Sequence, residues 1–277
     1  MQIIDNELPE MIAYFEDIIG KARIKHILRT GESATDKPYW YKYIKQYKRW
    51  QSRGERISDI ASNHKLMEFA IKVKGINEFA QDWDKPEFRD EFLKRLADSK
   101  RAEGLLFEIR TGIHFLVQGL DIHLILDACD KKTPDLQINL ENDAKVVVEC
   151  VLRSPSLGRE LCDSKLIDDL LKVASDKLES KYDWGCPRFV AVKIPEHIDW
   201  SAAGIRLGIE DRINRWFRQE RMASVNVLYF MGKETINPRW DNRSRLRAYY
   251  PDQLVFLFRN PLARYPLPQY MNSKIAG

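Results

Sequence analysis

The sequence is poor in metal-binding and disulfide-forming patterns. It has four cysteines and five histidines in 277 residues. None of the cysteines forms a Cys-x-x-Cys pair, and neither residue type has the spacing of a zinc site. Cysteines outside such patterns suit a reducing cytoplasm, where a thiol acts as a small buried hydrophobic group. We therefore expect no zinc site and a cytoplasmic protein.

Long apolar runs are also missing. No stretch approaches the roughly 20 apolar residues of a membrane helix. Residues 1–7 contain no basic region followed by an apolar run, which a signal peptide requires. The sequence has no internal repeat and no low-complexity tract. These absences predict a soluble protein that does not enter a membrane.

The composition is that of a globular protein. Apolar residues make up 44% of the sequence and charged residues 31%, which is enough for a hydrophobic core. The length fits one large domain or a domain with a substantial extension. A formal net charge of +4 allows nucleic-acid binding without implying it, because such binding depends on cations clustered on one face.

Residues 1–95 show almost no strand pattern, and we predict an all-helical N-terminal region there. Helical periodicity covers 8–29, a second helix begins near 38, and a third covers 57–73. A longer helical run extends over 88–119. Residues 96–277 form the second predicted domain.

The second of these helices alternates aromatic and cationic side chains. In one interpretation the rings pack in the core and the cations are solvated. In the other, rings and cations stack on bases and neutralise phosphates. We favour the first, and we retain Lys45 and Arg49 as candidate phosphate contacts. The aromatic residues are Trp40, Tyr41, Tyr43, Tyr47 and Trp50.

Glu108 lies on a close-packing face of the 88–119 run. On a helical wheel it falls between Gly104 and Gly112 and within ~20° of Phe115. Burying a carboxylate without a partner is costly. We therefore expect a cation, a metal or a hydrogen-bond donor beside Glu108, and a structural salt bridge would serve as well as a metal.

Two short strands, 135–140 and 145–152, each carry one acidic residue. Asp135 and Glu149 lie near the same end of a predicted antiparallel pair, with a turn over 141–144. The two carboxylates share a face only if the connecting loop has three or five residues, because side chains alternate along a strand. Two carboxylates on one face suit a hard cation such as Mg²⁺, which prefers oxygen ligands.

The rest of the chain alternates helix and strand. A strand over 121–126 precedes the acidic pair. A helix over 159–182, a strand over 188–194, a helix over 203–222 and a strand over 224–231 follow it. This order predicts an α/β domain with a mixed sheet. An arginine-rich segment, an apolar run over 254–258 and a proline-rich surface coil close the chain.

The order of these elements and the residues Glu108, Pro134-Asp135 and Glu149 resemble the PD-(D/E)XK nuclease superfamily, which has a restriction-endonuclease-like fold. The resemblance covers about residues 95–232. It implies a mixed sheet flanked by helices, with Asp135 and Glu149 as ligands of Mg²⁺ or Mn²⁺. It further implies that Glu108 is a third ligand or a base.

The lysine that this motif carries two residues after its glutamate is Val151 here, which puts activity in doubt. A loose bacterial group of the same fold also lacks this lysine, and Lys177, Lys181, Tyr182 and Pro187 match its Lys-x-x-x-Lys-Tyr pattern. The candidate replacement cations are Arg153, which cannot act as a base, Lys181, and the loop lysines Lys131 and Lys132. At ~1.5 Å per residue, Lys181 should lie some 30 Å along its helix from the carboxylates, so this geometry disfavours Lys177 and Lys181 as catalytic residues.

The sequence thus predicts a metal-dependent endonuclease that hydrolyses DNA phosphodiester bonds. The alternative is a catalytically inactive protein of the same fold that binds nucleic acid or a protein partner. An accidental acidic pair and a homodimer both stay open. The candidate nucleic-acid contacts are Lys131, Lys132, Lys45, Arg49, Arg243 and Arg245.

Overall fold

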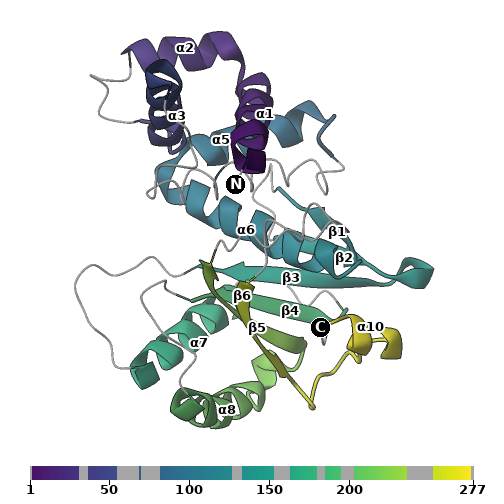
Figure 1. Ribbon diagram of the computed structural model, residues 1–277. Coiled ribbons are helices and arrows are strands. Elements are labelled where there is room, and N and C mark those ends of the chain that lie inside the picture. The colour runs from purple at the N-terminus through teal and green to yellow at the C-terminus, as the bar shows by residue number, and fades with distance from the viewer. Residues whose placement is uncertain are drawn as a thin grey trace. The chain divides into compact units, whose positions relative to one another are not determined.

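The computed structural model describes residues 2–30, 37–54, 69, 82–126, 133–152, 163–179, 185–194, 203–235 and 252–275 (Figure 1). The chain divides into two compact units, 1–110 and 111–277. The boundary between them falls inside helix α6 (Ser99–Val117). Each unit is described separately below.

The helical unit contains α1 (Gln2–Ile19), α2 (Lys21–Thr30), α3 (Tyr41–Arg53), α5 (Pro86–Ala97) and the first part of α6. Two of the predicted helical runs are divided. Gly20 has a φ of 92° and separates α1 from α2. Asp98 has an extended backbone between α5 and α6. Its Oδ1 accepts a hydrogen bond of 2.8 Å from the Lys100 amide and so caps the N-terminus of α6. Hydrophobic periodicity continues through both breaks, so it does not reveal them.

The aromatic side chains of α3 are buried, as the first interpretation predicts. Trp40 and the tyrosines of α3 belong to the core of this unit. The Tyr43 ring stacks on Phe69 with centroids 4.8 Å apart, and Trp40 meets Phe15 edge-on at 5.8 Å. Arg49 is exposed and Lys45 is partly exposed. The buried rings are therefore not placed to stack on bases, and only the cations remain as candidate contacts.

The described strands form one mixed six-stranded sheet in the order β1-β2-β3-β4-β5-β6. The neighbours β3 and β4 are parallel, as are β4 and β5, while the other pairs are antiparallel. This confirms the predicted α/β class with a mixed sheet. The strands are β1 (Asp121–Leu124), β2 (Leu136–Asn139), β3 (Lys145–Val151), β4 (Arg188–Lys193), β5 (Val225–Thr235) and β6 (Asp252–Arg259).

Helices cover both faces of the central strands. Helices α7 (Asp163–Glu179) and α8 (Ala203–Phe217) connect the parallel strands and share one hydrophobic core with Val190 and Leu228 (Figure 1). On the opposite face, the Phe115 ring of α6 lies 5.3 Å from that of Tyr229, centroid to centroid. Strands buried on both sides explain the continuous apolar runs in this part of the sequence.

The end of the chain differs from the predicted surface coil. A short helix, α10 (Gln269–Lys274), follows Pro268, and both Met271 and Ile275 are buried. The Lys274 ammonium donates to the carbonyl of Gly119 at 3.3 Å. Two apolar residues among polar ones are too few to reveal this docking by periodicity. In the described part of the chain, no helix has the length and apolar character to cross a membrane.

Candidate active site

The register of β2 and β3 brings Asp135 and Glu149 to the same face of the sheet. Leu136 pairs with Val148, so the next position places Asp135 opposite Glu149. The pair Asn139–Lys145 leaves five residues, 140–144, in the connection. The predicted turn over 141–144 is therefore one residue too short, and the five-residue connection satisfies the condition for a shared face. Asn142 and Asp143 in this connection have φ values of 60° and 59°, in the left-handed region.

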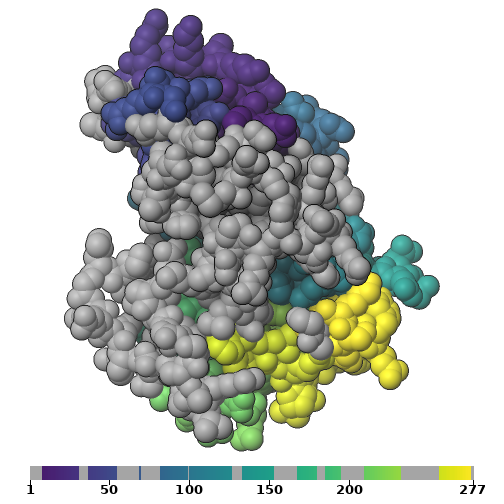
Figure 2. Space-filling view, in the orientation of Figure 1, coloured from purple at the N-terminus to yellow at the C-terminus, as the bar shows by residue number. Residues whose placement is uncertain are grey.

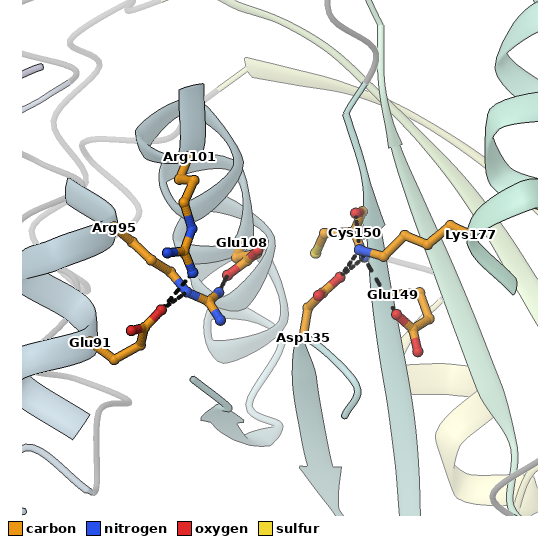
Figure 3. A network of polar contacts seen from close by, with 8 residues as sticks. All are labelled: Glu91, Arg95, Arg101, Glu108, Asp135, Glu149, Cys150 and Lys177. Atoms are coloured by element: carbon orange, nitrogen blue, oxygen red, sulfur yellow. Dashed lines mark hydrogen bonds and ion pairs between the residues drawn. The ribbon is translucent and has the colours of Figure 1, made fainter. Parts of the chain in front are cut away.

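Lys177 of α7 reaches this pair of carboxylates (Figure 3). Its ammonium donates a short hydrogen bond to Asp135 Oδ2 and another to the Cys150 carbonyl at 2.6 Å. Its Nζ also lies 3.9 Å from Glu149 Oε2. The Cys150 amide donates to Asp135 Oδ2 at 2.6 Å, which orients that carboxylate. We call Asp135, Glu149 and Lys177 the lysine cluster.

The expectation that Lys177 lies far from the carboxylates is wrong. That expectation assumes that the helix begins beside Glu149, which would place its last turns far from the carboxylates. In fact, β3 ends at Val151 and α7 begins at Asp163, and the chain then returns to the parallel strand β4. A helix that starts beyond the end of a strand comes back past it, so its last turns can lie beside the strand. The long lysine side chain covers the remaining distance.

The charged side chains of the lysine cluster are largely removed from solvent. The Glu149 side chain is 0% exposed, that of Asp135 is 14% exposed and that of Lys177 is 27% exposed. Burial by itself lowers the pKa of the Lys177 ammonium, but the facing carboxylates of Asp135 and Glu149 outweigh it and raise this pKa. The Lys177 ammonium thus faces two carboxylates at once.

The lysine cluster fits a divalent cation. The Lys177 ammonium, itself a cation, is hydrogen-bonded to Asp135 Oδ2 and the Cys150 carbonyl, and Glu149 Oε2 lies 3.9 Å away. Mg²⁺ is commonly held by one or two carboxylates and completes its shell with water. Asp135, Glu149 and the Cys150 carbonyl supply such a set. Within the described ranges, no group of three or more His, Cys, Asp or Glu side chains forms a metal site.

Glu108 belongs to a separate group of ion pairs in the helical unit (Figure 3). Its Oε2 lies 3.6 Å from Arg95, whose Nε lies 3.1 Å from Glu91 Oε1. The prediction of a cation beside Glu108 is therefore confirmed, and α5 supplies it. Its role as a third ligand or base stays a prediction. We call Glu91, Arg95, Arg101 and Glu108 the arginine cluster.

Glu91 is the centre of the arginine cluster. Arg101 approaches its Oε1 at 2.5 Å, in addition to Arg95. Partial burial by itself raises the pKa of Glu91, but hydrogen bonds from Arg95 and Arg101 outweigh it and lower this pKa. The arginine cluster thus places two guanidinium groups beside two carboxylates, and the Lys94 ammonium also lies 3.8 Å from Glu91 Oε2.

Of the other positions singled out in the sequence, the structure describes Val151, Lys45 and Arg49. Val151 is buried in the core beneath α7 and α8. Lys45 and Arg49 lie on α3, whose blue atoms adjoin those of α2 at the surface of the helical unit (Figure 2). Outside the described residues lie Lys131, Lys132, Arg153, Lys181, Arg243 and Arg245.

A polar network lies on β2 and β1. Gln137 donates to Asn139 Oδ1 at 2.8 Å, and Asn139 donates to Asp121 at 2.9 Å. His123 lies 2.5 Å from the Asn139 amide nitrogen. Alternation along β2 predicts that Gln137 and Asn139 face the same way as Asp135. The participation of β1 depends on strand pairing and was not predicted.

Comparisons with known proteins yield little. No family model matches this sequence, and no curated protein matches it. One matching solved structure is that of Pyrococcus furiosus SfsA in complex with Ca²⁺, with 15% sequence identity and a TM-score of 0.23. The match covers 50% of this chain and 59% of the SfsA chain. A likeness at this level carries no inference, so the site is interpreted from its own geometry.

Proposed function

We propose that this protein is a divalent-metal-dependent nuclease that hydrolyses phosphodiester bonds of DNA. The observation that carries the proposal is the position of Lys177. Its ammonium lies beside two strand carboxylates, where a phosphodiester-cleaving site needs a cation and where Val151 provides none. The helix thus supplies a lysine that the strand lacks.

Each residue has a distinct part in this proposal. Asp135, Glu149 and the Cys150 carbonyl hold Mg²⁺ or Mn²⁺. When bound, the metal neutralises phosphate charge and lowers the pKa of a bound water. Lys177 presents its ammonium to the negative charge that develops on the phosphoryl oxygens. The fully buried position of Glu149 in β3 keeps its carboxylate fixed during the reaction.

Substrate contacts are proposed for the polar network of β1 and β2. Gln137, Asn139 and His123 are partly exposed on the face that also carries Asp135. Amide and imidazole groups can donate hydrogen bonds to phosphate oxygens and to base edges. The predicted phosphate contacts of Lys45 and Arg49 belong to the same proposal, since α3 presents these cations at its surface.

A second candidate function is nucleic-acid or partner binding without catalysis. The observation that favours it is the hydrogen bonding of Lys177, whose ammonium already neutralises part of the carboxylate charge. A structural ion pair would look the same. In that case the lysine cluster would stabilise the fold, and divalent cations would have no effect on bound DNA.

Cleavage of supercoiled plasmid with Mg²⁺ or Mn²⁺ separates the two functions. We expect wild-type protein to nick the plasmid and Asp135→Asn to lose at least ~10²-fold of this activity, because it removes a metal-binding charge while keeping the shape. Asp143→Asn makes the same chemical change at an exposed turn position and should cleave like wild type. Equal cleavage by all three proteins would refute the proposed site.

A further inference from the structure

The Lys177 ammonium lies among the oxygens that would hold a metal ion at the proposed site. Its Nζ is hydrogen-bonded to Asp135 Oδ2 and lies 2.6 Å from the Cys150 carbonyl oxygen and 3.9 Å from Glu149 Oε2. These are the oxygens that the donor chemistry assigns to Mg²⁺. Mg²⁺ binds its ligands at 2.0–2.1 Å. Two cations cannot share this one cradle of oxygens.

We infer that Lys177 and the divalent cation occupy this cradle alternately, so that metal binding expels the ammonium. The inference rests on the proposed metal site and adds an exchange step to it. In the metal-free protein Lys177 neutralises the carboxylates and preserves their arrangement. On metal binding the ammonium leaves, and it becomes available to a substrate phosphate.

The surroundings of Lys177 allow this exchange without movement of the helix. Its neighbours Ala174 and Leu178 are buried and anchor the last turns of α7. The Lys177 side chain itself is 27% exposed, so it already has a path to solvent. A lysine has a flexible four-carbon stem and a compact charge, so rotation of the side chain is sufficient.

The opposite arrangement would hold both cations at once. Lys177 would then keep its hydrogen bonds to Asp135 and to the Cys150 carbonyl while the metal bound elsewhere on the carboxylates. The two arrangements differ in the accessibility of one amine. If the two cations alternate, metal binding exposes the Lys177 amine to solvent. If both are held at once, the amine stays hydrogen-bonded and inaccessible.

Amine labelling read by mass spectrometry tests the exchange directly. Wild-type protein is treated with sulfo-N-hydroxysuccinimide acetate with and without Mg²⁺, in the absence of nucleic acid. We expect Mg²⁺ to increase labelling of Lys177 at least tenfold. Lys172, which is exposed on the same helix, serves as an internal reference and should label equally in both conditions.

Calorimetric titration of the same samples with Mg²⁺ measures whether the metal binds, so that the labelling can be interpreted in either case. Metal binding with unchanged or reduced labelling of Lys177 would overturn the exchange and leave the metal site standing. A titration without any binding would overturn both. Asp135→Asn should bind no Mg²⁺ and should label at Lys177 equally with and without the metal.

A matched pair of variants gives a second measurement. Lys177→Met keeps the length of the side chain and removes the competing charge. We expect it to bind Mg²⁺ at least tenfold more tightly than wild type, whereas Lys172→Met on the exposed side of α7 should bind like wild type. An unchanged or weaker affinity of Lys177→Met would contradict the exchange.

Discussion

Two clusters of buried carboxylates occur in this chain, and they are neutralised differently. The arginine cluster has two carboxylates and two guanidinium groups, whereas the lysine cluster has two carboxylates and one ammonium. Arginine stays charged at all accessible pH values and binds carboxylates through a rigid planar fork, whereas lysine is a point charge on a flexible stem. The two clusters therefore differ in the kind of cation that faces their carboxylates.

The largest expected difference between the clusters is in catalysis. Lys177→Met should lower Mg²⁺-dependent plasmid nicking by ~10²–10³-fold, because it removes a group that stabilises charge in the transition state. The metal-binding oxygens remain, so the loss should appear in the rate of cleavage at saturating Mg²⁺. Lys172→Met is the matched control. If both variants cleave like wild type, Lys177 has only a structural role.

Substitutions in the arginine cluster should affect stability and leave activity unchanged, in contrast to those in the lysine cluster. Glu91→Gln should lower the free energy of unfolding by about 2 kcal/mol, because two arginines lose a partly buried partner. It should leave cleavage unchanged. Glu108→Gln removes a carboxylate that lies 3.6 Å from Arg95, a longer contact than those between Glu91 and the two arginines, and should cost about 1 kcal/mol. Urea unfolding and plasmid nicking, measured on both variants, give the two quantities.

These two variants also test the predicted role of Glu108 as a ligand or base. That role requires Glu108→Gln to lower cleavage by about tenfold more than Glu91→Gln does. Equal cleavage by the two variants would assign Glu108 to the ion-pair network alone. Because the two substitutions are chemically identical, their comparison cancels the effect of losing one carboxylate from the cluster.

The smallest expected effects are in the pH dependence of stability. The lowered pKa of Glu91 means that its contribution is complete above its unfolded value of about 4.3 and is lost as the pH falls through the folded value. The raised pKa of Lys177 means that its contribution is complete below about 10.4 and is lost only as the pH rises through the folded value.

Urea unfolding, measured over a range of pH with a chelator present to keep the protein metal-free, tests both of these pH dependences. The difference in unfolding free energy between wild type and Glu91→Gln should shrink below about pH 4. The difference between wild type and Lys177→Met should stay constant between about pH 7 and pH 9. A Lys177 difference that disappears within this neutral range would show that its ammonium is not held by the carboxylates.

The sequence predicts the sheet and the acidic pair because both follow from local rules. Alternation along β2 and β3 predicts that Asp135 and Glu149 share a face if the connection has three or five residues, and the structure has five. The predicted turn over 141–144 has only four, because the prediction assigns Leu140 to the first strand. The need of a buried carboxylate for a cation likewise predicts a partner for Glu108. These properties depend on neighbours in the chain or on the free energy of a single group.

The position of Lys177 could not be predicted by the same means. It depends on where α7 begins relative to the end of β3, and a helical pattern does not contain that information. The breaks at Gly20 and Asp98 were missed because hydrophobic periodicity continues across them. Docking of Met271 depends on tertiary packing of a helix too short for a periodic signal.

The order of the strands in the sheet has a consequence for the way the chain acquires its site. Each strand pairs with its predecessor in the chain. Synthesis proceeds from the N-terminus at about 5–20 residues per second, so the β2–β3 hairpin leaves the ribosome before α7. We expect the nascent hairpin to bring Asp135 and Glu149 together before Lys177 has been synthesised. Until then water solvates the two carboxylates, so their pairing with Lys177 is a late step that accompanies the burial of Glu149 by β4 and α7.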